Sequence, residues 1–217
     1  MNDRSAEPAA TAVGALHEKF VLGRRARVLA GHLAALIPPH ARVLDVGCGD
    51  GIVAQLIATQ LPDVSIEGID VLVRPAAKIP VRAFDGTRIP YPDQTFDVAM
   101  FVDVLHHADD PLSLLREAAR VATRIVIKDH LREGFLAGPT LRFMDWVGNA
   151  RHGVALTYAY WSEKEWDYAL QEAGLRETTK LVSLGLYPVP VSWFFERRLH
   201  FIARFEPSGQ SEAKASS

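Results

Sequence analysis

The sequence has few of the features that mark disulfide-bonded, membrane-spanning or nucleic-acid-binding proteins. Among 217 residues there is a single cysteine, Cys48, so no disulfide can form within the chain. The formal net charge is −2, without the basic excess that is typical of nucleic-acid binding. The chain has no run of about 18 apolar residues for a membrane-spanning helix, and Met1 to Ala12 lacks the apolar centre of a signal peptide. These features predict a cytoplasmic protein with no nucleic-acid partner and no integral membrane segment.

The composition is sufficient for one folded domain. Apolar residues make up 48% of the chain, which is enough for a sizeable core at this length. The small and polar residues of 1–13 and 206–217 predict disordered tails. We therefore expect a single domain over residues 14–205, with the irregular segment at about 131–160 as a cap insert.

The stretch from Arg42 to Gln60 combines a short apolar strand, a glycine-rich turn and an apolar-faced helix. Glycine has no Cβ, so this turn allows a ligand to approach the backbone closely. A dinucleotide-binding turn has the spacing G-x-G-x-x-G, but Ile52 stands where its third glycine would be. Asp45, just before the turn, would repel a pyrophosphate and attract an ammonium group. The pattern therefore favours a cofactor with an ammonium group over a dinucleotide.

Strands and helices alternate along the rest of the chain. Apolar runs of five to seven residues, as in Phe96–Val102, indicate buried parallel strands. The alternation predicts an α/β fold, in which a parallel sheet carries helices on both faces. The expected strands are 42–46, 64–70, 81–86, 96–102, 124–130, 177–184 and 199–205. The expected helices are 15–37, 52–60, 111–121 and 163–173, with Asp109 or Asp110 and Ser162 as caps of the last two.

Acidic residues close the second and third expected strands. Asp70 ends the second strand, and Asp85 is followed by Gly86 after the third. Ligands of open α/β sheets bind at the carboxyl ends of the strands. A carboxylate at Asp70 can accept both hydroxyl protons of a ribose. Both acids could instead cap the turns that follow them.

The segment Asp45-Val46-Gly47-Cys48-Gly49-Asp50-Gly51 resembles motif I of the class I methyltransferases, which use S-adenosylmethionine (SAM). Phe84-Asp85-Gly86 is similar to the adenine site of that family, and 89–98 and 104–111 resemble runs of its small-molecule members. Together they identify the chain as a member of the type 11 methyltransferase group, in a bacterial small-molecule branch. One departure is that Val71-Leu72-Val73 follows Asp70, where the family prefers a polar or aromatic residue.

The resemblance implies a fold, a cofactor and its binding residues. The fold is a doubly wound, seven-stranded, mostly parallel sheet of order 3-2-1-4-5-7-6 whose last strand is antiparallel. The cofactor is SAM. The residues implied to bind it are Asp45, Gly47, Cys48, Gly49, Asp70, Val71, Asp85, Gly86, Val102 and His107.

Three histidines are candidate catalytic residues. His106 and His107 follow the fourth expected strand, and His130 ends the fifth. Each could act as a general base near neutral pH, or could be part of the framework beside the cofactor. No Cys/His spacing predicts a metal site.

Polar and aromatic residues of the insert are candidate substrate contacts. Together with a residue of the first helix, the candidates are Phe20, Met144, Trp146, Asn149 and His152. The alternative is that the aromatic side chains near 146–166 are core. Trp193-Phe194-Phe195 precedes Arg197 and Arg198. This apolar stretch could be a membrane-facing wedge, a buried turn, or, with helix 15–37, the mouth through which a hydrophobic or amphiphilic acceptor enters.

The expected function is methyl transfer from SAM to the oxygen, carbon or small amine of a small molecule, which could be hydrophobic or aromatic. No Asn-Pro-Pro-Tyr motif follows the fourth strand, which argues against amino-group methylation of nucleic acids and of protein glutamine. Two alternatives stay open: a SAM-binding subunit without catalysis, and a nicotinamide oxidoreductase. The sequence specifies neither the acceptor nor the oligomeric state.

Overall fold

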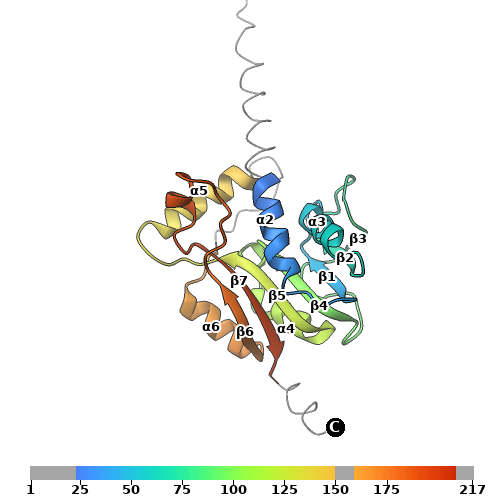
Figure 1. Cartoon of the computed structure of the whole chain (residues 1–217). Coiled ribbons are helices and arrows are strands. Elements are labelled where there is room, and N and C mark those ends of the chain that lie inside the picture. Colours follow the sequence, from blue (N-terminus) through green and yellow to red (C-terminus); the bar gives the residue numbers. More distant parts are fainter. Residues whose placement is uncertain (1–22, 150–158, 209–217) are drawn as a thin grey trace, which may run out of the picture.

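The computed structural model of the protein describes residues 23–149 and 159–208. Its centre is a seven-stranded sheet of order β3-β2-β1-β4-β5-β7-β6 (Figure 1). β7 is antiparallel to both β5 and β6, and the other pairs of neighbours are parallel. This arrangement confirms the expected fold, strand order and antiparallel last strand. The strands are β1 (Arg42–Val46), β2 (Ser65–Asp70), β3 (Val81–Ala83), β4 (Phe96–Val102), β5 (Ala122–His130), β6 (Leu175–Leu181) and β7 (His200–Pro207).

Helices cover both faces of the sheet because the central strands are apolar on both sides. In β1, Leu44 and Val46 pack with α4 and α6, whereas Val43 packs on the opposite face with α2 and α3. The helices are α2 (Gly23–Ala34), α3 (Ile52–Gln60), α4 (Pro111–Val121), α5 (Ala137–Asn149), α6 (Glu163–Glu172) and α7 (Ser192–Phe195), with one 3₁₀ turn, η2 (Leu105–His107). None of the described helices has the length and apolar character needed to cross a membrane.

The helix boundaries follow from local chemistry. The Asp110 side chain accepts a hydrogen bond from the Ser113 backbone N–H at 3.0 Å and caps α4. Ser162 and Glu165 form a reciprocal capping box at the start of α6. Both caps are at positions that the sequence predicted, and Asp110 rather than Asp109 is the cap of α4.

Several boundaries differ from the sequence expectation. β3 ends at Ala83, because Asp85 and Gly86 form a turn. β7 continues to Pro207, so 206 and 207 belong to the sheet and not to the expected tail. The expected insert contains α5, and the described part of the expected first helix is α2, which ends at Ala34.

The carboxyl ends of the parallel strands and the amino end of β7 meet at one edge of the sheet. His130, the last residue of β5, pairs with His200, the first of β7. α5 and the short α7 lie at this end of the molecule (Figure 1). The glycine turn after β1 and the residues that follow β2 and β4 therefore share an edge with the segment that was expected to form a cap.

Candidate active site

The glycine turn after β1 needs glycine for both conformation and space. Gly47, Gly49 and Gly51 have φ angles of 72°, 59° and 73°, in the region that L side chains rarely adopt. A Cβ on Gly47 would lie 2.6 Å from Cγ1 of Val104. The turn is therefore packed directly against the segment that follows β4. Gly68 in β2, which the sequence reasoning missed, is required for space alone, since a Cβ there would lie 2.5 Å from the Cys48 sulfur.

Asp45 is a buried carboxylate beside this turn. Its residue is only 3% exposed, and its Oδ1 has no hydrogen-bond partner among the described residues. Burial, together with the nearby charge of Asp70, raises the pKa of Asp45 to about 8. A cationic group bound here would satisfy this oxygen and favour the ionised carboxylate.

Asp70 connects the end of β2 to the glycine turn. Its Oδ2 accepts a hydrogen bond from the Gly49 N–H at 2.7 Å, and its Oδ1 accepts one from the Leu72 N–H at 2.8 Å. A carboxylate oxygen can accept a second hydrogen bond, so both oxygens retain capacity for hydroxyl groups. The carboxylate is thus held in a fixed orientation at the carboxyl edge.

Asp85 organises the turn after β3. Its Oδ1 accepts hydrogen bonds from the Thr87 N–H and Oγ1–H, both at 2.8 Å, and from the Arg88 N–H at 2.9 Å. These hydrogen bonds lower the pKa of Asp85, and the bond from the Thr87 N–H contributes most. Val71 is exposed beside Gly86, where a Cβ would lie 3.2 Å from Cγ1 of Val71. The apolar Val71 and the Asp85 turn thus lie next to each other.

Cys48, Val102 and His107 complete the expected cofactor-binding set. Burial and the charges of Asp45 and Asp70 raise the pKa of the Cys48 thiol to about 12, so it stays neutral at physiological pH. Val102 is the half-buried last residue of β4, and the His107 N–H donates to the Val104 carbonyl within η2 at 2.9 Å. Contacts among the described residues do not show whether Cys48, Val102 and His107 bind a ligand.

The structure places His106 and His130 around one buried carboxylate, Asp129. Nδ1 of His106 lies 2.6 Å from Oδ1 of Asp129, and Nδ1 of His130 lies 3.3 Å from the same oxygen. The Leu105 and His130 N–H groups also donate to Asp129. Burial alone would raise the pKa of Asp129, but the two histidines lower it overall, so this carboxylate is ionised.

The two histidines differ in their surroundings. Burial and the neighbouring Lys128 ammonium lower the pKa of His130 to about 4, so this ring is neutral at pH 7. The His106 ring packs against that of Tyr160 at 5.3 Å between centroids, and against His107 at 4.0 Å. Of the three candidate bases, His106 is the one held by a short contact to an ionised carboxylate.

The shortest distance within this cluster is that of a hydrogen bond. Candidate ligand atoms of His106, Asp129 and His130 lie within 4.8 Å of one another. Two ligands of one tetrahedral zinc ion, bound at about 2.0–2.1 Å, lie roughly 3.3 Å apart. The 2.6 Å separation between His106 and Asp129 is shorter and is typical of a charge-assisted hydrogen bond.

A second buried charge network was missed by the sequence reasoning. Asp103, which has a φ of 58° just after β4, forms ion pairs with the Lys128 ammonium and with Arg25 of α2, the latter at 2.5 Å. Lys128 is fully buried, and its Nζ lies 3.5 Å from Nδ1 of His200. The signal that could have found this network is the charged Lys128 inside the apolar run of β5. The network connects α2 to the carboxyl edge.

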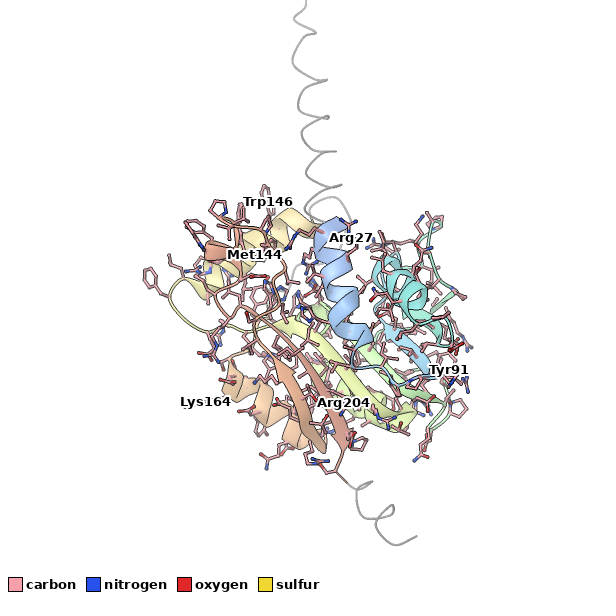
Figure 2. The ribbon with its side chains drawn as sticks, viewed as in Figure 1. Arg27, Tyr91, Met144, Trp146, Lys164 and Arg204 are labelled. Atoms are coloured by element: carbon pink, nitrogen blue, oxygen red, sulfur yellow. The ribbon has the colours of Figure 1, made fainter. Side chains whose placement is uncertain are left out.

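Of the expected substrate contacts, only two have described side chains. Met144 is half-buried and Trp146 is 56% exposed, both on α5 at the carboxyl end of the sheet (Figure 2). Asn149 ends α5, but its side chain, like Phe20 and His152, lies outside the described part of the structure. The alternative that the aromatic residues are core is correct for Tyr160 and Trp166, which are 5% and 4% exposed.

The sheet order, the glycine turn and the acid that ends β2 together define a class I methyltransferase fold. Residues 21–180 match a family model described as "Methyltransferase domain", and the chain belongs to this family. A SAM-dependent methyltransferase from Aquifex aeolicus has the same fold, with a TM-score of 0.59, 21% identity, and coverage of 82% of this chain and 89% of that chain.

Two curated relatives are similar to part of the chain. The chain is 35% identical over 108 residues to the 27-O-demethylrifamycin SV methyltransferase of Amycolatopsis mediterranei (strain S699). The matched segment covers 43% of this chain and 39% of that protein. It is 35% identical over 92 residues to the ubiquinone biosynthesis O-methyltransferase of Aliivibrio fischeri (strain MJ11), which covers 37% of this chain and 38% of that protein. The chain thus spans about two fifths of the length of these relatives.

The cofactor that the family implies is SAM, and the residues present fit it. The methionine part of SAM carries an ammonium group, which suits the unpaired oxygen of Asp45. A pyrophosphate offers neither a hydrogen-bond donor nor a positive charge to the same oxygen. The geometry therefore agrees with SAM and not with a dinucleotide.

Proposed function

We propose that the protein transfers the methyl group of SAM to the hydroxyl oxygen of a small, largely apolar acceptor. The observation that carries the proposal is the buried Asp45 beside a turn of three left-handed glycines, because its Oδ1 has no hydrogen-bond partner among the described residues. Oxygen is favoured as the accepting atom because of the names of the two curated relatives above. One is named an O-methyltransferase, and the other is named a methyltransferase of 27-O-demethylrifamycin SV. An apolar acceptor is favoured by the aromatic side chains of α5 at the same edge, among them Trp146.

In this proposal, the chain's own residues bind and orient the reactants. SAM supplies an activated methyl group on a sulfonium, so the protein's main tasks are to position the acceptor and exclude water. Asp45 with Gly47 and Gly49 holds the methionine end, and Asp70 accepts from the ribose hydroxyls. Val71, the Asp85–Gly86 turn, Val102 and His107 surround the adenosine.

His106 acts as the general base in the proposed reaction. The ionised Asp129 accepts from the Nδ1–H of His106, and this short contact holds the ring in one orientation. Bound SAM would supply the methyl group to the acceptor's oxygen, and His106 would take the hydroxyl proton that this oxygen releases. His130 is neutral and holds Asp129 in place, so it is a positioning residue.

Calorimetry with SAM, S-adenosylhomocysteine and NADH tests the cofactor. We expect binding of the first two and none of NADH; binding of NADH alone would support the oxidoreductase and contradict the proposal. A panel of phenols and aliphatic alcohols with labelled SAM then tests the reaction. Binding of SAM without transfer of label to any of them would favour the alternative of a SAM-binding subunit without catalysis.

A further inference from the structure

Large apolar side chains are exposed together at the carboxyl end of the sheet. They come from the loop before α5, from α5 and from α7, and we call them the apolar face: Phe135, Leu136, Phe143, Trp146, Trp193 and Phe194. Phe135 is the most exposed of them, at 84%, and Trp193 is 67% exposed. Side chains of this size are costly to leave in water, so a gathering of six marks an interaction surface.

Contacts between the three segments make the apolar face continuous. The Phe143 ring lies 6.4 Å from that of Trp146 and is stacked at 6.4 Å on that of Phe195 in α7. Arg197, just after α7, donates to the Phe135 carbonyl at 3.4 Å and to Oγ1 of Thr140 at 3.0 Å. Segments separated by about 60 residues are thus held side by side as one surface.

Exposed arginines accompany the apolar side chains. Arg142 precedes Phe143 on α5, and Arg197 and Arg198 follow α7. Arg27 of α2 lies at the same end of the molecule as Trp146 (Figure 2). The same segments also carry two carboxylates: Glu196 accepts from the Tyr187 N–H, and Glu133 accepts from the Glu163 N–H. These cations stand out in a chain whose net charge is −2.

The combination of exposed aromatic groups and arginines distinguishes between two possible partners of the apolar face, a second copy of the chain and a lipid surface. In a symmetric dimer the face would meet its own copy, and the arginines of one subunit would oppose those of the other. An anionic lipid surface instead offers acyl chains to Phe135 and Trp193 and phosphate groups to the arginines. We propose that the apolar face docks the protein on anionic membranes, with the carboxyl edge of the sheet turned toward the lipid.

Flotation with vesicles tests this docking without requiring methyl transfer. The probes are vesicles of phosphatidylcholine alone and of phosphatidylcholine with phosphatidylglycerol, at low and physiological salt. We expect the full-length protein to float with the anionic vesicles only, less so as salt rises, and the double variant W193S/F194S to lose at least tenfold in bound fraction. Tyr168→Ser is the matched control, because Tyr168 is 64% exposed on α6 yet lies outside the apolar face.

Further variants separate docking from misfolding and from self-association. Phe135→Ser changes a different segment and should also reduce flotation, and Arg198→Gln should do so more than Arg176→Gln, a 56% exposed arginine of β6. Retained SAM binding shows that each variant is folded. The proposal is wrong if the control and the W193S/F194S variant float equally, if neutral vesicles bind as well as anionic ones, or if W193S/F194S instead converts a dimer to a monomer in sedimentation.

Discussion

The substitution Asp45→Asn tests the assignment of this carboxylate through stability and ligand binding together. The pKa of Asp45 rises from an ordinary value of 3.8 to about 8 in the folded protein, because the carboxyl group is buried near Asp70. Between these two pH values the folded state holds a proton that the unfolded state has released. The free energy of unfolding of the ligand-free protein therefore falls as pH rises through this window.

The size of the effect follows from the same two values. Between pH 3.8 and 7 the loss amounts to about 4 kcal/mol, at about 1.4 kcal/mol for each pH unit. An asparagine has nearly the same shape and does not titrate. We expect the ligand-free Asp45→Asn protein to be more stable than the parent at pH 7. The difference should shrink toward pH 4, which is close to the ordinary pKa of 3.8 that Asp45 has in the unfolded chain.

SAM binding should change in the opposite direction. Without its ionised partner, the ammonium group loses a charge-assisted hydrogen bond of roughly 1.5–3 kcal/mol, which weakens binding about 10- to 150-fold. In the parent, affinity should rise by up to about tenfold from pH 6 to 7, because binding ionises Asp45 and releases a proton. In Asp45→Asn the affinity should be almost independent of pH over this range.

Urea denaturation from pH 4 to 8 measures the stability, and calorimetry in two buffers of different ionisation enthalpy measures affinity and proton release. Glu67→Gln is a useful control, since Glu67 is a carboxylate of neighbouring β2 that accepts a hydrogen bond from the Tyr91 hydroxyl at 2.7 Å. The reasoning is refuted if Asp45→Asn binds SAM as tightly as the parent, or if the ligand-free variant is less stable at pH 7.

Three further substitutions probe the rest of the site. Asp70→Ala should weaken SAM binding by roughly 1.5–3 kcal/mol in calorimetry, because two ribose hydroxyls lose a charged acceptor and Gly49 loses its partner; unchanged affinity would exclude ribose binding. Gly47→Ala should unfold at a lower denaturant concentration than the parent, since its Cβ would lie 2.6 Å from Val104 at a φ of 72°. The control Gly31→Ala, in α2 with no atom within 4 Å of its Cβ, should be neutral or stabilising by about 0.5–1 kcal/mol. His106→Gln should lower kcat about 10²- to 10⁴-fold in a methyl-transfer assay while SAM affinity stays within twofold; an unchanged kcat would make His106 part of the framework.

The sequence by itself determined the architecture and the cofactor class. Phe96–Val102 is apolar on both faces except at Asp97, and a short run of this kind indicates a strand that is covered on both sides. The glycine turn was recognisable because left-handed backbone conformations require particular residue types at fixed spacing. The same local chemistry located Asp45, Asp70 and the caps at Asp110 and Ser162. The resemblance to a known family supplied the strand order, which periodicity alone does not specify.

Only the tertiary structure decided which charged residues meet. Asp129 and His106 are 23 positions apart, and Arg25 and Asp103 are 78 apart, so neither pair is visible as a spacing in the sequence. Burial was equally hidden: Trp166 is core whereas Trp146 is exposed, although both lie on helices with apolar neighbours. A buried charge is tolerated only where a partner from another element reaches it. That condition depends on how β4, β5, β7 and α2 pack together, and the order of residues along the chain does not contain it.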